Sequence, residues 1–372
     1  MDIRDLRPPV EDGPWPPLTQ LPPMTFEPLA RATSWQQLIY AQGGGFRPLL
    51  MDVHVPATPR PAPVVLWVHG GGWGEGDRRL VPLQWGQQEF FQQFVDAGIA
   101  VATCDYRLIA EAPVEAMVQD IVAAIRYLRR YAGELALDAD RVAVWGDSAG
   151  SHLSSLAALA GSAPDPDPAI LGSQGVGEGR ADVTGIVWWY GASDLTVLPE
   201  LCEFLWATAT PEERTTLAER YSPVTYLRAD SPPLLIMHGD QDTMAPFDQA
   251  VRLHEAAVAV GAPSRLLVVP GAEHAFLGAD IRAQWQTGLD FLAGLFAGGR
   301  APAAARACSS LGKRSPDACP RRVVDHRNDA GSAHDHPGRQ APGRVAPNTD
   351  QAYRVWRIAE HNGRQPPQVA HQ

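Results

Sequence analysis

Short runs of apolar residues alternate along the chain with longer segments in which apolar residues recur every three or four positions. The runs have the length of buried strands, and the longer segments have the spacing of helices with one buried face. The segment 113–131 is the clearest helix, since apolar residues from Val114 to Leu128 keep that spacing. Strands crossed by helices in this way predict an α/β protein, in which a mostly parallel sheet has helices on both faces.

The other expected elements can be placed on the sequence in the same way. Alternating apolar and polar residues at 49–55 predict an outer antiparallel strand with one solvated face. Buried strands are expected to begin near residues 63, 98, 141, 182, 231 and 264, and helices are expected at 84–97, 113–131, after Ser148, at 247–260 and at 281–295.

Composition divides the 372 residues into three parts. Residues 1–45 form a proline-rich N-terminal extension, and residues 46–297 carry the strand and helix pattern of one globular domain. Within that domain, residues 191–232 interrupt the pattern as a small helical, cap-like insertion. Residues 298–372 are rich in Ala, Pro, Arg and Gly and carry 12 Lys or Arg against 6 Asp or Glu, which predicts a disordered basic tail.

Charge and cysteine content narrow the possible partners. The formal net charge of −11 and the pI of about 5.4 disfavour nucleic acids and membrane surfaces, because both are anionic. Four cysteines without a CxxC pair indicate free thiols in a reducing compartment and no metal site. The N-terminal residues lack an uninterrupted apolar stretch, and no apolar run reaches membrane-spanning length. We therefore expect a cytoplasmic protein that acts on small molecules, with its oligomeric state unknown.

Chemically versatile side chains directly follow the predicted strands. Ser148 lies in Gly-Asp-Ser-Ala-Gly between a strand and a helix, and Asp242 and His274 each follow a later strand. Because the carboxyl ends of parallel strands meet at one edge of a sheet, we expect these three side chains to lie together. A serine here could simply cap the next helix. The order serine, acid, histidine instead predicts a nucleophile, an orienting acid and a base, which need no cofactor.

Other residues remain alternatives for the acid and the base. Asp240 could replace Asp242 if the loop turns differently, and Asp194 follows the strand that begins near residue 182. His152, one helical turn after the serine, is expected to pack or to form a local hydrogen bond. His69 and His238 are expected to organise loops.

The glycine-rich stretch His69-Gly70-Gly71-Gly72 is suited to stabilise an oxyanion. Residues without side chains let backbone N–H groups approach a substrate closely, and such donors stabilise the negative charge that develops during acyl transfer. We assign the N–H groups of Gly71, Gly72 and Ala149 to this oxyanion hole. A purely structural glycine turn is the alternative.

Five motifs in order resemble one branch of the α/β-hydrolase superfamily, the hormone-sensitive-lipase-like and feruloyl/acetylxylan-esterase-like serine carboxylesterases. They are HGGGWGEGD, DYRL, DADRVAVWGDSAGSHL, HGDQDTMAP and PGAEHAF, and the resemblance covers roughly residues 49–295. It implies an eight-stranded sheet, makes 46–297 the catalytic domain, and assigns nucleophile, acid and base to Ser148, Asp242 and His274. Ser151 departs from the pattern, because the family usually has glycine there, and a side chain could crowd the first helical turn.

Three aromatic residues are candidates for substrate binding. Phe204 and Trp206 lie in the insertion, where apolar side chains could line a pocket over the serine, and Trp73 follows the glycine loop. Ordinary core packing explains all three equally well.

These observations predict a serine hydrolase that cleaves carboxylic esters of small substrates through an acyl-enzyme intermediate. An arylformamidase-like amidase is the first alternative, because that family also has a glycine-rich loop before a tryptophan. A non-catalytic small-molecule receptor on the same fold is the second, although such receptors usually lose one of the three catalytic residues. A third hypothesis gives the basic tail a role in docking or retention.

Overall fold

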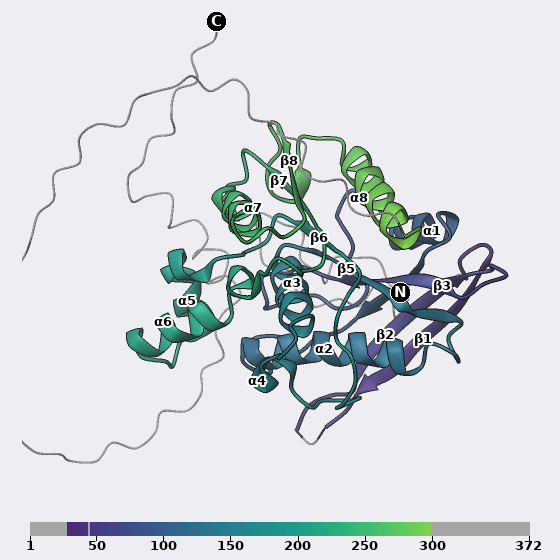
Figure 1. Cartoon of the computed structure of the whole chain (residues 1–372), viewed down its shortest axis with the longest axis horizontal. Coiled ribbons are helices and arrows are strands. Elements are labelled where there is room, and N and C mark those ends of the chain that lie inside the picture. Colours follow the sequence, from purple (N-terminus) through teal and green to yellow (C-terminus); the bar gives the residue numbers. More distant parts are fainter. Residues whose placement is uncertain (1–27, 44, 299–372) are drawn as a thin grey trace, which may run out of the picture.

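The computed structural model describes residues 28–43 and 45–298, which form an eight-stranded sheet in the order β1-β2-β4-β3-β5-β6-β7-β8 (Figure 1). Strands β3 to β8 run parallel, while β2 is antiparallel to both β1 and β4. The expected mostly parallel sheet is therefore confirmed. The strands are β1 (Ala32–Ala41), β2 (Leu49–Pro56), β3 (Ala62–Val68), β4 (Ala100–Cys104), β5 (Leu137–Asp147), β6 (Ile186–Trp189), β7 (Leu234–Gly239) and β8 (Ser264–Val269).

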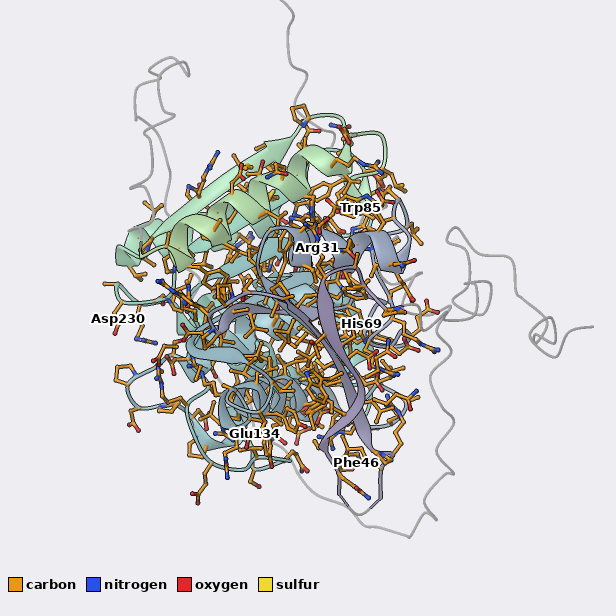
Figure 2. The ribbon with its side chains drawn as sticks, turned by 90° about the vertical axis from the view of Figure 1, so that its right-hand side faces the viewer. Arg31, Phe46, His69, Trp85, Glu134 and Asp230 are labelled. Atoms are coloured by element: carbon orange, nitrogen blue, oxygen red, sulfur yellow. The ribbon has the colours of Figure 1, made fainter. Side chains whose placement is uncertain are left out.

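Helices cover both faces of the sheet. Helices α1 (Gln87–Asp96) and α8 (Ile281–Phe296) lie on one face, and α2 (Val114–Arg130), α3 (Ala149–Gly161) and α7 (Asp248–Val260) lie on the other. Side chains fill the space between these layers (Figure 2). Under α8, the rings of Trp145 and Trp285 stack 4.5 Å apart, and Gly288 leaves room for the Trp145 ring. The helices expected from apolar spacing are thus all present.

The antiparallel edge of the sheet differs from the expectation. The outer strand is β1, which lies within the predicted N-terminal extension, so the sheet begins before the expected boundary at residue 46. Strand β2 is second from the edge and almost wholly buried, so the prediction of a solvated face is wrong. Its polar residues are buried because they have partners: Asp52 binds Arg78, and His54 binds Ser34.

The segment 191–232 is helical, with the 3₁₀ turns η3 (Leu195–Val197) and η4 (Pro223–Tyr226) flanking α5 (Pro199–Leu205) and α6 (Pro211–Arg220). In Figure 1, α5 and α6 project from one side of the body. Thr210 and Glu213 form a reciprocal capping box that starts α6. The loop 161–182 includes one short helix, α4 (Pro168–Leu171).

Two further expectations concern the chain as a whole. Every helix within residues 28–298, residue 44 aside, is too short or too polar to cross a bilayer. The predicted basic tail lies outside the described residues, as do residues 1–27 of the extension.

Candidate active site

Ser148 lies in a sharp turn between β5 and α3. Its φ of 51° and ψ of −121° are a strained combination for a residue with a side chain. The turn is tight because α3 begins directly against the end of β3: a Cβ on Gly150 would overlap the carbonyl oxygens of Val68 and His69. The Ser148 hydroxyl makes no capping hydrogen bond to α3, so it can bind groups outside the turn.

Ser151, the departure from the family pattern, connects the strands on either side of this turn. Its hydroxyl oxygen lies 2.6 Å from the carbonyl oxygen of Gly146 and 2.8 Å from both the backbone nitrogen and the carbonyl oxygen of Trp189. The side chain therefore accepts one hydrogen bond and donates another inside the core. Instead of crowding the helix, Ser151 joins the end of β5 to the end of β6.

The three predicted catalytic side chains meet at the carboxyl ends of β5, β7 and β8. His274 Nε2 lies 3.0 Å from Ser148 Oγ, and His274 Nδ1 lies 2.8 Å from Asp242 Oδ2. With Nδ1 protonated toward the carboxylate, Nε2 is the unprotonated nitrogen and can accept the serine proton. Burial alone would raise the pKa of Asp242, but His274 and His238 lower it well below its usual range. Asp242 is therefore ionised at neutral pH.

Backbone groups fix the Asp242 carboxylate in place. Its Oδ1 accepts hydrogen bonds from the N–H groups of Met244 and Ala245 at 2.9 and 2.7 Å. Its Oδ2 also lies 2.9 Å from Nε2 of His238, a fully buried residue next to the end of β7. The sequence indicated only that His238 organises a loop, and this contact shows which group it holds.

The alternative acids bind elsewhere. Asp240 Oδ1 accepts a hydrogen bond from the Gly271 N–H at 2.7 Å, which joins the loop after β7 to the loop after β8. Asp194 caps η3 and pairs with Arg252 at 3.3 Å. Only Asp242 among the three has a hydrogen bond to His274 in the described part of the chain.

The glycine loop after β3 lies beside Ser148. A Cβ on Gly70 would approach the Ser148 Cβ to 3.1 Å, and Gly71 has a φ of 105° that favours glycine. Among the described residues, the N–H groups of Gly71, Gly72 and Ala149 have no hydrogen-bond acceptor. They are therefore available to a substrate oxygen, as an oxyanion hole requires.

Asp147 holds the glycine loop against the nucleophile turn. Its Oδ1 accepts a hydrogen bond from the Gly70 N–H at 2.7 Å. Desolvation raises the pKa of this carboxyl to about 7, although the Gly70 bond and His274 oppose the shift. The sequence singled out the neighbouring serine and gave no signal for this contact.

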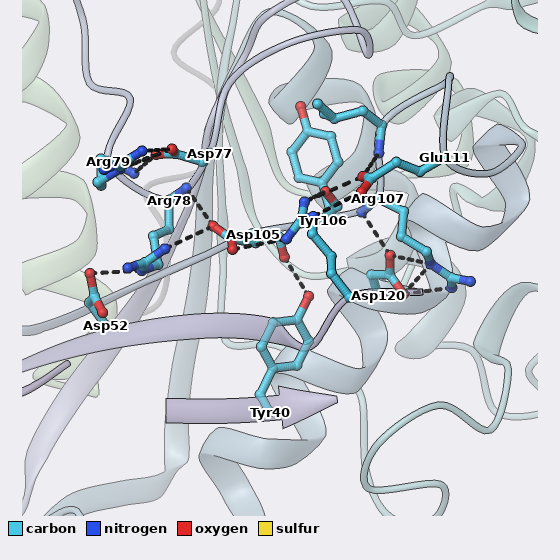
Figure 3. Close-up of polar contacts among 12 residues, drawn as sticks. Tyr40, Asp52, Asp77, Arg78, Arg79, Asp105, Tyr106, Arg107, Glu111 and Asp120 are labelled. Carbon is cyan, nitrogen blue, oxygen red and sulfur yellow. Dashed lines mark hydrogen bonds and ion pairs between the residues drawn. The ribbon is translucent and has the colours of Figure 1, made fainter. Parts of the chain in front are cut away.

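The DYRL segment also supports the glycine loop, and Figure 3 shows the polar contacts of Asp105 and Arg107 in this segment. The Tyr106 hydroxyl lies 3.0 and 3.1 Å from the carbonyl oxygens of His69 and Gly70, and its ring stacks on the His69 ring. Asp105 accepts from the backbone N–H of Arg78, whose guanidinium pairs with Asp52 on β2. The loop is thus tied to the antiparallel edge of the sheet through buried ion pairs.

The three candidate substrate-binding residues are all buried. Phe204 and Trp206 belong to the main core, and the Trp206 indole N–H donates to Glu115 on α2 at 3.1 Å. Trp73 is also in this core and its indole N–H points to His152. The structure therefore shows core packing for each of them, and their contact with a substrate stays a prediction.

Tyr190 is a further residue at the site that the sequence analysis did not identify. It follows β6 with a φ of 36°, and its ring meets the His274 ring edge-on at 4.9 Å. Nothing in the sequence distinguished it from the other aromatic residues of the β6 region. In the part of the chain that the structure describes, no cluster of His, Cys, Asp and Glu could hold a metal ion.

The sheet order, with the serine, aspartate and histidine after β5, β7 and β8, defines an α/β-hydrolase. Comparison with known proteins narrows this class. The chain belongs to the BD-FAE family, whose model matches residues 51–257.

Relatives of known name support this placement. The chain is 31% identical over 198 residues to the probable carboxylic ester hydrolase LipM of Mycobacterium tuberculosis, covering 51% of this chain and 43% of that protein. It is 29% identical over 259 residues to the esterase LipQ of the same organism, covering 65% and 58%. The chain thus spans about half the length of the curated relatives it matches.

Solved structures show the same fold. A truncated carbohydrate esterase from gut microbiota has a TM-score of 0.62 and 25% identity, covering 72% of this chain and 98% of that one. Esterase 2 of Thermogutta terrifontis, in a propionate-bound structure, has a TM-score of 0.54 and 24% identity, covering 70% and 92%.

Proposed function

We propose that the protein is a serine hydrolase that cleaves carboxylic esters of small substrates. The observation that carries the proposal is the continuous chain of hydrogen bonds from Ser148 through His274 to Asp242, at 3.0 and 2.8 Å. Among the described residues, the three backbone N–H groups beside it have no acceptor, and the relatives reported above are named as esterases and ester hydrolases. The segment 191–232 is the cap of this domain in our proposal.

The geometry supports a two-step reaction. His274 Nε2 takes the hydroxyl proton as Ser148 Oγ attacks the ester carbonyl, and Asp242 stabilises the imidazolium that forms. The N–H groups of Gly71, Gly72 and Ala149 bind the oxyanion. His274 returns the proton to the leaving alcohol, which completes the acyl-enzyme. A water then attacks the acyl group by the same route, and release of the acid restores Ser148.

The test is the hydrolysis of p-nitrophenyl esters from acetate to long acyl chains by the wild type and Ser148→Ala. We expect Ser148→Ala to lose at least about 10³-fold in kcat, because no other group can replace the nucleophile. Ser155→Ala is the matched control. It removes a hydroxyl of α3, the helix that follows Ser148, and this hydroxyl donates to the Ser151 carbonyl. The Ser155→Ala variant should keep the wild-type turnover. Equal turnover by Ser148→Ala and wild type would refute the proposal.

A further inference from the structure

A chain of buried hydrogen bonds joins the insertion to the glycine loop through His152. Its Nε2 lies 2.8 Å from the carbonyl oxygen of Tyr221, and its Nδ1 lies 3.2 Å from the indole Nε1 of Trp73. His152 is 0% exposed, Trp73 1% and Tyr221 3%. The three residues come from α3, from the loop after β3, and from the C-terminal end of α6.

The partners at the two ring nitrogens determine the tautomer of His152. A carbonyl oxygen can only accept, so the proton lies on Nε2 and is donated to Tyr221. An indole N–H can only donate, so Nδ1 must be the unprotonated nitrogen that accepts from Trp73. Burial lowers the pKa of His152 to about 4, which keeps the ring neutral at neutral pH. The Tyr221 carbonyl therefore selects the tautomer of His152 that can accept the hydrogen bond from Trp73.

Trp73 needs this support because its backbone is strained. It has a φ of 60°, a left-handed conformation that is unfavourable for a large side chain. Its carbonyl oxygen accepts a hydrogen bond from the Ile109 N–H at 2.8 Å, and its ring meets the His152 ring edge-on at 5.5 Å. Trp73 directly follows Gly71 and Gly72. A shift of the indole therefore moves the two N–H groups that are proposed to bind the oxyanion.

We propose that His152 is a positioning residue that fixes Trp73, and with it the oxyanion-binding N–H groups, in a geometry set by the insertion at Tyr221. The inference rests on the proposed function, because its consequence is a rate of ester hydrolysis. It gives the insertion a second role besides covering the site: its backbone sets the tautomer of a residue in the nucleophile helix.

Two substitutions of His152 separate its two hydrogen bonds. In His152→Asn, the amide oxygen takes the position of Nδ1 and accepts from Trp73, with no need for Tyr221. In His152→Gln, the amide nitrogen takes the position of Nε2 and donates to Tyr221, but the acceptor at the position of Nδ1 is lost. Trp73→Phe removes the same hydrogen bond from the other side. His54→Asn is the control, because it alters another buried histidine whose partner, Ser34, lies at the antiparallel edge.

The experiment measures kcat and KM with p-nitrophenyl acetate, together with urea unfolding of each variant. We expect His152→Gln and Trp73→Phe to lower kcat by about 10- to 100-fold with KM within about twofold, the size expected for a displaced catalytic donor. His152→Asn and His54→Asn should stay within about threefold of the wild-type kcat. The double variant His152→Gln/Trp73→Phe should be no slower than the slower single variant, because both remove one interaction.

Two results would overturn the inference while leaving the proposed function intact. One is a wild-type kcat in His152→Gln and Trp73→Phe. The other is an equal fall in kcat for His152→Asn and His152→Gln that adds to the effect of Trp73→Phe, since this would indicate general disruption of the core. If the wild type itself has no Ser148-dependent turnover, the proposed function fails first.

Discussion

Replacing Asp242 by asparagine separates the proposed acid from its neighbour Asp240. In the wild type, Asp242 Oδ1 accepts from two backbone N–H groups and Oδ2 from two histidine nitrogens. An amide offers one oxygen that accepts and one NH₂ group that only donates. Its NH₂ group must therefore face either the two backbone donors or the two rings. The backbone N–H groups cannot reverse, so the NH₂ group faces His274 and favours the tautomer in which Nε2 carries the proton.

The expected loss of kcat has two causes: the wrong tautomer of His274 is favoured, and the negative charge that stabilises its imidazolium is removed. We expect Asp242→Asn to lower kcat by about 10³- to 10⁴-fold, which corresponds to about 4–5.5 kcal/mol of barrier. Asp240→Asn is the matched control, because its amide oxygen can still accept from the Gly271 N–H. The kcat of Asp240→Asn should stay within about threefold of the wild-type kcat, since the hydrogen bond to Gly271 takes no part in the proton transfer.

The assay is turnover of p-nitrophenyl acetate at pH 8, with circular dichroism to confirm that both variants are folded. A larger loss in Asp240→Asn than in Asp242→Asn would refute this reasoning and move the acid to Asp240.

Three further predictions concern stability and the nucleophile turn. Ser151→Gly should lower the free energy of unfolding by about 1–3 kcal/mol in urea, because the buried Trp189 N–H loses an acceptor; an unchanged midpoint would contradict this. Gly150→Ala should lower kcat more than about tenfold, because its Cβ would push α3 away from the carbonyls of Val68 and His69; wild-type turnover would show that the turn can relax. Burial lowers the pKa of His54 to about 4 in the folded protein. As the pH falls below 6.5, His54 is therefore protonated in the unfolded chain but not in the folded one, and the wild type loses stability between pH 6.5 and 4. His54→Asn lacks this loss, so the stability of the wild type relative to the variant should fall by about 2–3 kcal/mol from pH 7.5 to 4.5 in urea unfolding; a constant difference would contradict the shift.

The sequence predicted the parallel part of the fold because its strands are continuous apolar runs with buried faces on both sides. It missed β1 because apolar and polar residues do not alternate along this strand, although the exposure of its side chains does. The register with β2 shifts between Trp35 and Leu38, and between them Gln37 has a φ of 59° and donates its N–H to Asp52. The burial of β2 was equally hidden, since Asp52 is a polar residue in the sequence and acquires its partner Arg78 only in the folded chain.

The candidate site likewise contains residues that the sequence predicts and contacts that it does not. Ser148, Asp242 and His274 could be predicted because each follows a strand, and parallel strands bring such positions together without any knowledge of side-chain packing. The contacts of Asp147 with Gly70 and of His152 with Trp73 could not, because they depend on how the glycine loop folds back over α3. The separations of 77 and 79 residues leave no local pattern to detect.

The distance along the chain between Ser148 and His274 also bears on how the protein is made. The two residues are 126 positions apart, and His274 follows the last strand of the sheet. At about 5–20 residues per second, a ribosome needs about 6–25 s to pass from one to the other. Throughout that time a nascent chain has Ser148 without the proposed base. The contact between Ser148 and His274, and with it the proposed hydrolysis, therefore cannot form before β8 and the loop after it have been synthesised, and the recovery of activity on refolding would report that β8 has joined the sheet.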